Sequence, residues 1–326
     1  MKPISTAFFL LVCIVSLGST TAHSHDLKLT ETEQTIHITQ RGKPVLNFVK
    51  VTRPVPKGLE SHYSRSGYIH PVFSPTGQEV SGDYPLDHAH QHALFFAWTK
   101  ATFQGKTIDF WNQFKQQANV EFREVLHTQQ EENQIRFSVK LAYVVGAGEE
   151  QVDAIYESWT VTVYQTPDEY FLFDLTSVQS CASDKPLIVE QNHYGGMAFR
   201  GHSQWLKTSD DQDTKPTGFQ FLTSEGKNRI DGNHTQPNWV AMTGPIDGQQ
   251  VSLTAFCSPH NFRSPQHVRL HPTKPYFCFA PMVDGAFEIK PGQKYTSNYR
   301  FLVTSEAVNP EQNHKQWQQY VHTHKQ

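Results

Sequence analysis

The 326-residue sequence has little of what would place it in a specialised class of protein. It contains four cysteines and a formal net charge of −3. It therefore lacks both a disulfide-rich framework and the strong positive charge typical of nucleic-acid-binding proteins. After residue 22, no apolar run is long enough to span a membrane as a helix. The composition predicts a globular protein with no nucleic-acid partner and no membrane span.

Several signatures of well-known active sites are also missing. The sequence has no GxSxG nucleophile elbow, no GxGxxG, no P-loop and no HExxH. These absences exclude the common signatures of serine hydrolases, dinucleotide-binding proteins, nucleotide-triphosphate-binding proteins and zinc peptidases. Any site must be found from clusters of polar residues.

The strongest apolar segment is at the start of the chain, MKPISTAFFLLVCIVSLGSTTA. Lys2 precedes an apolar run over residues 7–17, and small residues lead up to Ala22. This order is typical of a secretory signal peptide, here residues 1–22. We therefore expect an exported protein, either periplasmic or extracellular.

Three cysteines remain beyond this segment: Cys181, Cys257 and Cys278. An odd number allows at most one internal disulfide. Because Cys257 and Cys278 each lie in an apolar run, SLTAFCSP and YFCFAP, we expect buried free cysteines rather than a disulfide.

The periodicity of the chain is that of strands. Alternating or β-branched and aromatic runs, separated by turn sequences such as RGKP and GPIDG, recur along the chain. The runs are TIHITQ, KPVLNFVKVTRP, QIRFSVKLAYVV, IYESWTVTVYQT, EYFLFDLTSVQS, QVSLTAFC, YFCFAP and YTSNYRFLVTS. Residues 135–180 are expected to form three consecutive antiparallel strands.

These runs predict an all-β fold in which two large sheets pack face to face. We expect a single sandwich domain over residues 26–308. A helical tail is expected over 309–326, because Pro310 stands where a helix can begin.

The segment DHAHQHALFFAW, residues 87–98, carries three alternating histidines. On an extended strand His88, His90 and His92 would share one face about 7 Å apart. They could bind or act on a substrate, two of them could hold a transition metal, or they could be structural. Asp87 could orient one ring.

A second polar cluster is EQNHYGGMAFRGHSQW, residues 190–205. It combines Glu190, Asn192, His193, Tyr194, Arg200 and Trp205 with the pair Gly195 and Gly196. Paired glycines allow close backbone approach. Hydrogen-bonding groups beside aromatic rings suit a hydroxyl-rich ligand such as a sugar. The alternative is a glycine turn beside a buried salt bridge.

Three further segments supply weaker candidates. Asn261, Arg263, His267 and Arg269 lie in the polar segment 258–272, which is equally typical of a surface turn. In TIDFWNQ, Asp109 and Trp111 would share a face if extended, although Trp111 could belong to the core. Arg65 and His70 lie upstream of the histidines and could enter the same pocket.

The order of several motifs resembles the methane oxygenase PmoA-like family over roughly residues 40–305. The motifs are GYIHPVFSPTG, DHAHQHALFFAW, DFW, HYGGMAFR, NWVAMTGPIDG, NFRSP and YRF. Membrane methane oxidation is not expected, because the chain has no spanning segment after its signal.

GYIHPVFSPTG leading to QHALFFAW, with EQNHYGG and FEIKPGQKYTSNYRF, more weakly resembles the aldose 1-epimerase (galactose mutarotase) family. This resemblance implies a β-supersandwich and a sugar substrate. It also implies that His92 binds the ring, His193 is the general acid, and a late acid, Glu288 or Asp284, is the base. Ala93 departs from the family pattern by replacing a glycine.

We therefore expect an exported carbohydrate-active enzyme of epimerase, lyase or hydrolase type. His92 and His193 are the predicted catalytic residues. The predicted substrate-binding residues are His88, His90, Arg65, His70, Asp109, Trp111, Asn192, Tyr194, Arg200, Trp205, Asn261, Arg263 and His267. The ligand would be a small carbohydrate or an oligosaccharide. No cofactor is expected, and the alternatives are a non-catalytic carbohydrate-binding protein or a divalent-metal enzyme using His88, His90 and His92.

Overall fold

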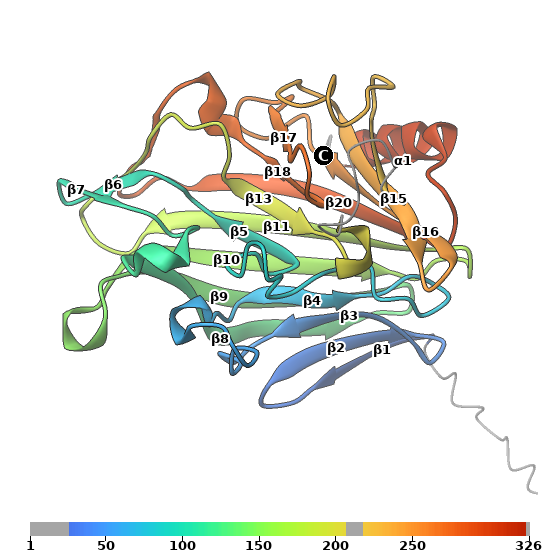
Figure 1. Ribbon diagram of the computed structural model, residues 1–326. Helices are drawn as coiled ribbons and strands as arrows, with labels where there is room; N and C mark the ends of the chain where they lie inside the picture. Colours follow the sequence, from blue (N-terminus) through green and yellow to red (C-terminus); the bar gives the residue numbers. More distant parts are fainter. Residues whose placement is uncertain (1–25, 207–217, 324–326) are drawn as a thin grey trace, which may run out of the picture.

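The computed structural model describes residues 26–206 and 218–323, which form two large antiparallel sheets, a small sheet and one helix (Figure 1). The expected signal peptide, residues 1–22, lies outside these ranges. No helix in the described part of the chain is both long and apolar enough to cross a membrane. The expected all-β sandwich with a short C-terminal helix is confirmed.

The first sheet has eight strands and carries most of the residues discussed below. In spatial order they are β1 (Leu27–Glu31), β2 (Thr35–Gln40), β3 (Lys43–Val49), β4 (Tyr68–Val72), β5 (Leu94–Ala97), β13 (Gly196–Arg200), β18 (Tyr276–Phe279) and β17 (Val268–Leu270). The long connection between β4 and β5 contains the alternating histidines.

The second sheet also has eight strands. Their order is β14 (Gln220–Thr223), β15 (Trp239–Ile246), β16 (Gln249–Cys257), β20 (Tyr295–Thr304), β11 (Tyr170–Cys181), β10 (Val152–Tyr164), β9 (Gln134–Val145) and β8 (Ala118–Gln130). Strands β9, β10 and β11 pair consecutively and antiparallel, which confirms the prediction for residues 135–180.

A small four-stranded sheet lies beside the two large ones. It consists of β19 (Phe287–Ile289), β12 (Leu187–Val189), β6 (Ala101–Phe103) and β7 (Lys106–Ile108). The short 3₁₀ helices are η1 (Ser61–Tyr63), η2 (Gln113–Lys115), η3 (Gly148–Glu150), η4 (Ser203–Trp205) and η5 (Pro281–Asp284).

The hydrophobic core lies between the large sheets and follows from the two-residue period of the strands. In β9 the buried side chains alternate with partly exposed ones, as at Phe137 and Val139. Phe48 of the first sheet packs edge-on against Phe137 and Trp159 of the second, at ring-centroid distances of 5.8 and 6.2 Å. Each such ring contributes about 1.5–3 kcal/mol by leaving water.

The helix α1 (Pro310–Thr323) begins at the predicted proline and covers the outer face of the second sheet. Tyr320 and Trp317 pack against Trp239, Phe256 and Leu302, which point away from the main core. Figure 1 shows α1 beside β15 and β16. The cysteines Cys181, Cys257 and Cys278 are free, and the last two are buried as expected.

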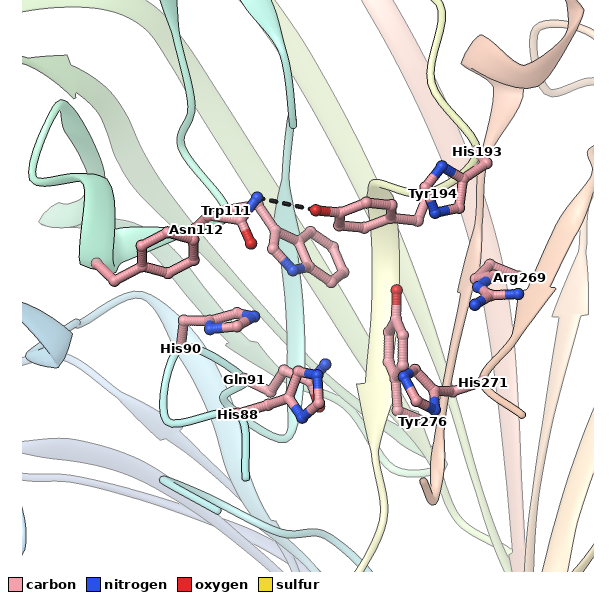
Figure 2. A pocket seen from close by; sticks show the side chains of 11 residues that line it. His88, His90, Gln91, Trp111, Asn112, His193, Tyr194, Arg269, His271 and Tyr276 are labelled. Carbon is pink, nitrogen blue, oxygen red and sulfur yellow. Dashed lines mark hydrogen bonds between the residues drawn. The ribbon is translucent and has the colours of Figure 1, made fainter. Parts of the chain in front are cut away.

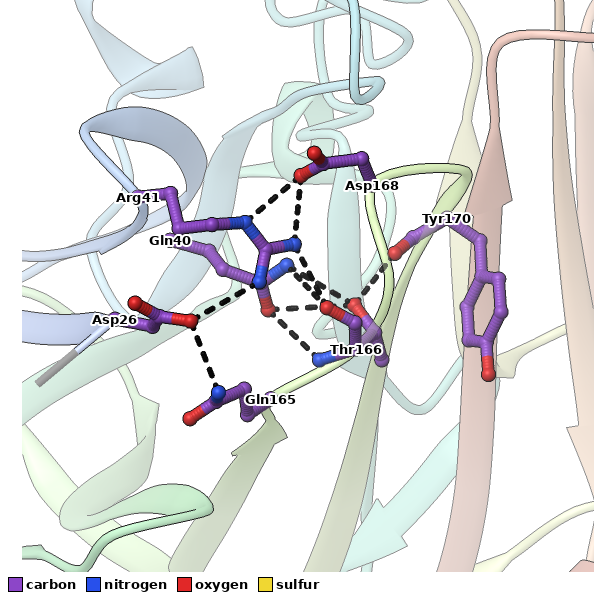
Figure 3. Close-up of polar contacts among 7 residues, drawn as sticks. All are labelled: Asp26, Gln40, Arg41, Gln165, Thr166, Asp168 and Tyr170. Carbon is purple, nitrogen blue, oxygen red and sulfur yellow. Dashed lines mark hydrogen bonds and ion pairs between the residues drawn. The ribbon is translucent and has the colours of Figure 1, made fainter.

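A polar junction ties the first sheet to the second at one end (Figure 3). Gln40, at the end of β2, accepts from the backbone N–H of Thr166 and donates to its carbonyl, both at 3.0 Å. Arg41 also donates to that carbonyl at 2.7 Å and pairs with Asp168. Gln40 is buried, while Asp168 is exposed. Removing the Gln40 contacts should therefore lower the free energy of unfolding more than removing the Asp168 ion pair.

We expect Gln40→Ala to lower the free energy of unfolding by about 1–3 kcal/mol, because it leaves the buried N–H of Thr166 without an acceptor. Asp168→Asn removes an exposed ion pair at the same junction and should cost about 0–1 kcal/mol. Urea unfolding of the two variants measures both effects. Equal losses of unfolding free energy in the two variants would contradict the larger contribution assigned to the buried Gln40 amide.

Candidate functional site

A cavity of about 290 Å³ opens where several connections of the first sheet meet (Figure 2). The loop before β5, the turn after β7, the segment before β13, and the neighbourhood of β17 and β18 contribute its walls. It is lined by His88, His90, Gln91, Trp111, Asn112, Phe114, His193, Tyr194, Arg269, His271 and Tyr276. We refer to this cavity as the histidine pocket.

The alternating histidines do not lie on a strand, which corrects the expectation of an extended row. Residues 84–93 form a looped connection, and β5 begins only at Leu94. Tyr84 and Ala93, near its two ends, have φ of +48° and +49°, in the left-handed region that favours glycine. The His88 ring therefore lies 5.5 Å from His90 and 5.4 Å from His271, by ring centroids.

Arg200 holds this loop in place from beneath. Its guanidinium is fully buried at the end of β13 and donates to Gln91 Oε1 at 2.7 Å and to Asp87 Oδ1 at 2.8 Å. Asp87 Oδ2 lies 2.9 Å from His88 Nδ1, so the predicted orientation of a ring by Asp87 matches this geometry. Arg200 is thus a support of the pocket wall and does not line the cavity.

His92 lies away from the pocket. It is fully buried, with Nδ1 2.9 Å from Asp83 Oδ1 and Nε2 2.9 Å from Gln113 Oε1. Its ring packs against Tyr68 and Tyr84. Because both ring nitrogens are occupied inside the protein, the structure gives His92 a structural position rather than the expected catalytic one.

The turn after β7 brings aromatic residues to the pocket. Strand β7 ends at Ile108, so Asp109 and Trp111 do not share a strand face as expected. Asp109 Oδ1 instead accepts the backbone N–H groups of Trp111 and Asn112 at 3.0 and 2.8 Å. Its Oδ2 accepts from Lys115 Nζ at 2.7 Å. Asp109 therefore shapes the turn, while Trp111 lines the cavity.

The HYGG segment forms the opposite wall. A Cβ on Gly196 would lie 2.4 Å from the carbonyl oxygen of Phe279, so β13 can approach β18 only because this residue is glycine. The expected close approach is confirmed. His193 and Tyr194 precede it and line the cavity, and Tyr194 Oη accepts from Asn112 Nδ2 at 3.0 Å. Asn192 binds Thr99 Oγ1 instead and does not line the pocket.

The remaining predicted residues serve other parts of the fold. Arg65 is buried and donates to the carbonyl of Phe96 at 2.8 Å. His70 lies 3.0 Å from Ser81 Oγ. The buried indole of Trp205 donates to the carbonyl of Pro245 at 3.1 Å. None of the three lines the histidine pocket.

Three residues predicted from the segment 258–272 also bind other parts of the protein. Asn261 donates to the carbonyl of Asn298, and Arg263 to that of Pro281, both at 2.9 Å. His267 Nε2 lies 2.8 Å from Asp284 Oδ1. Asp284, one of the two candidate bases, is therefore already paired. Glu288, the other candidate base, pairs with Lys290. These residues do not line the pocket.

Arg269, His271 and Tyr276 line the pocket. Arg269 was one of the weaker candidates of the segment 258–272, whereas His271 and Tyr276 were not predicted. A signal was present in the sequence VRLH. Val268 and Leu270 are buried, and Arg269 and His271 alternate with them and are partly exposed. A two-residue period along a short strand therefore directs both polar side chains to the face that borders the cavity.

Desolvation lowers the pKa of three imidazoles of the pocket, those of His90, His193 and His271. Desolvation, together with the charge of His88, lowers the pKa of His90 to about 3 and that of His271 to about 4. The pKa of His193 is lowered by desolvation and by the charge of Arg269. Burial opposes ionisation of Asp87, but the hydrogen bond with His88 and the Arg200 guanidinium outweigh it and hold its pKa well below its usual range.

The described part of the chain contains no set of side chains arranged to bind a metal ion. No three His, Cys, Asp or Glu side chains there have the arrangement that would hold an ion. The suggested set of His88, His90 and His92 fails because His92 lies elsewhere, bound to Asp83 and Gln113.

Residues 35–318 match the sequence model of DUF6807, a family of unknown function. No curated protein matches the chain. The PmoA-like family is not shown by these comparisons, so that resemblance stays a prediction.

Among solved structures, the heparan sulfate lyase HepC from Pedobacter heparinus aligns at 9% identity and a TM-score of 0.38 over 87% of this chain. The α-N-acetylgalactosaminidase NagBb from Bifidobacterium bifidum, in complex with GalNAc, aligns at 10% and 0.33 over 92%. This chain spans 35% and 38% of the lengths of these two proteins.

YeaD from Salmonella typhimurium, assigned as a mutarotase, aligns at 10% identity and a TM-score of 0.34. The alignment covers 87% of this chain and 95% of YeaD. TM-scores of this size do not carry conclusions about function, so the site is interpreted from its own geometry.

We expect the imidazoles of His90 and His271 to titrate with midpoints of about 3 and about 4, because the folded protein desolvates them. Unfolded imidazoles titrate near about 6.5, so the folded state binds fewer protons below that pH. These two groups therefore lower the free energy of unfolding as the pH falls from about 6.5 towards about 3.

Heteronuclear NMR of the imidazole resonances measures the midpoints directly. His90→Gln and His271→Gln assign the two signals, and the urea-unfolded protein supplies the reference titration. A midpoint above about 6 for either ring in the folded protein would contradict the effect of burial.

Proposed function

We infer that this chain, which belongs to the family of unknown function DUF6807, binds a carbohydrate in the histidine pocket and acts on it by proton transfer. The observation that carries the proposal is the gathering of imidazoles with lowered pKa values around one cavity. A neutral imidazole can accept a proton, and the imidazolium so formed can donate one.

The chemical lining of the pocket suits a sugar. The imidazoles and the Tyr194 hydroxyl offer hydrogen-bonding groups of the kind that hydroxyls require. Phe114 is 51% exposed and borders the cavity, whereas Trp111 lines it but is almost fully buried. An exposed aromatic face such as that of Phe114 can pack against the apolar face of a sugar ring.

The cavity volume, about 290 Å³, is at the lower end of the range for small-molecule sites. A short carbohydrate, or one residue of an oligosaccharide, is the proposed ligand. The same acid–base pair serves an isomerase, a lyase or a hydrolase.

His193 and His271 are the proposed acid–base residues. Both line the cavity, and Figure 2 shows them on the two sides of Arg269. One imidazole removes a proton from a carbon or hydroxyl of the sugar, and the other donates a proton to an oxygen. The signal-like segment at residues 1–22 supports the further proposal that the protein acts after export.

We expect His193→Ala and His271→Ala each to lower kcat/KM by about 10²–10⁴, because each removes a general acid or base. Proton NMR of reactions with a panel of neutral and acidic sugars detects anomerisation, epimerisation and cleavage in one measurement. His127→Ala is the matched control, because it removes an exposed imidazole from β8.

Other outcomes separate the rival functions. Turnover by both variants at the wild-type rate would overturn the assignment of these residues. Sugar-induced thermal stabilisation without any product would favour a non-catalytic binding protein. A stoichiometric transition metal in untagged protein, lost in His90→Ala, would favour metal-dependent chemistry.

A further inference from the structure

Arg269 is a charged side chain of the histidine pocket whose charge the fold does not balance. It lies in the edge strand β17, is partly buried, and borders the cavity. Across residues 26–206 and 218–323, its guanidinium forms neither an ion pair nor a hydrogen bond. A guanidinium that borders a cavity with its donors unpaired can bind an anion there.

The carboxylates near the pocket are already paired. Asp87 binds Arg200 at 2.8 Å, and Asp109 binds Lys115 at 2.7 Å. Asp284 lies 2.8 Å from His267. None of the described residues lining the cavity is itself an aspartate or glutamate.

The effect of the Arg269 charge reaches the proposed acid–base residues. Desolvation is the main cause of the lowered pKa of His193 and of His271, and the charge of Arg269 adds to it at both rings. All three side chains line the same cavity, so a group bound to Arg269 shares that cavity with both imidazoles. Figure 2 shows the guanidinium on the wall between them.

Resting on the proposed carbohydrate function, we propose that the histidine pocket selects a sugar that carries an oxyanion, and that Arg269 binds this group. The planar fork of an arginine matches the two oxygens of a carboxylate or sulfate. A uronate carboxylate and a sulfate ester share this chemistry. The neutral imidazoles and aromatic rings then contact the rest of the sugar.

The test compares matched sugars by isothermal titration calorimetry with wild-type protein, Arg269→Gln and Arg269→Lys. The first pair of probes is oligogalacturonate, which is charged, and a neutral galactose oligomer. The second set is glucuronate and glucose 6-sulfate, which are both charged, and neutral glucose. We expect the charged member to bind at least about tenfold tighter, since hydrogen bonds to charged groups are the stronger ones. Comparing glucuronate with glucose 6-sulfate distinguishes the carboxylate from the sulfate.

Arg269→Gln should weaken binding of the charged sugar by about 10–100-fold and change binding of the neutral one by less than about threefold. Arg269→Lys keeps the charge but loses the planar fork of donors, so its affinity for the charged sugar should lie between those of the wild type and Arg269→Gln. Arg229→Gln is the matched control, because it removes a partly buried arginine outside the pocket that stacks on Phe219. Thermal melts confirm that each variant is folded.

Two results would overturn the inference and leave the carbohydrate function standing. The first is equal affinity of the wild-type protein for neutral and charged sugars. The second is an equal loss of affinity for neutral and charged sugars in Arg269→Gln, which would mean that Arg269 only supports the fold. If Arg269→Gln does not fold, equal affinity of Arg269→Lys and wild type for the charged sugar overturns it. Absence of binding to any sugar would overturn both proposals.

Discussion

The histidine pocket depends on the pairing of one buried cation, the guanidinium of Arg200. This side chain is fully buried at the end of β13, where an unpaired charge would be strongly destabilising. Asp87 and Gln91 accept hydrogen bonds from its two terminal nitrogens, and both belong to the loop that carries His88 and His90. The same pairing thus stabilises the sheet and fixes the wall of the cavity. A loop with only polar surface contacts would not hold two imidazoles so close together.

Most of the fold could be predicted from the sequence because sandwich strands have a simple physical period. Alternating runs such as QIRFSVKLAYVV put one face in the core, and β9, β10 and β11 formed where that pattern indicated. Pro310 likewise marked the start of α1. The partners of each strand were less accessible. β5 pairs with β13 about a hundred residues later, and no local pattern indicates that pairing.

The site was predicted only in part, because two features of the loop cannot be recognised from alternation. DHAHQH alternates like a strand, but Tyr84 and Ala93 adopt positive φ and bend the chain into a loop. Glycine would have signalled such a bend, and neither position has one. His92 consequently turns inward to Asp83, while His88 meets His271. His193 and Tyr194 line the cavity, and the adjacent glycine pair indicated in the sequence that strands approach closely there.

The arrangement of arginines explains why charge matters in this pocket. Two of the buried arginines are paired with carboxylates: Arg200 binds Asp87, and Arg300 binds Asp174 through two hydrogen bonds. Arg269 has no such partner among the described residues and faces a cavity. Because desolvation already keeps His90 and His271 uncharged near neutral pH, Arg269 supplies the main fixed charge of the lining. Neutral imidazoles beside one fixed positive charge can accept a proton from a ligand whose anionic group that charge binds, whereas a pocket of protonated histidines would have no proton acceptor.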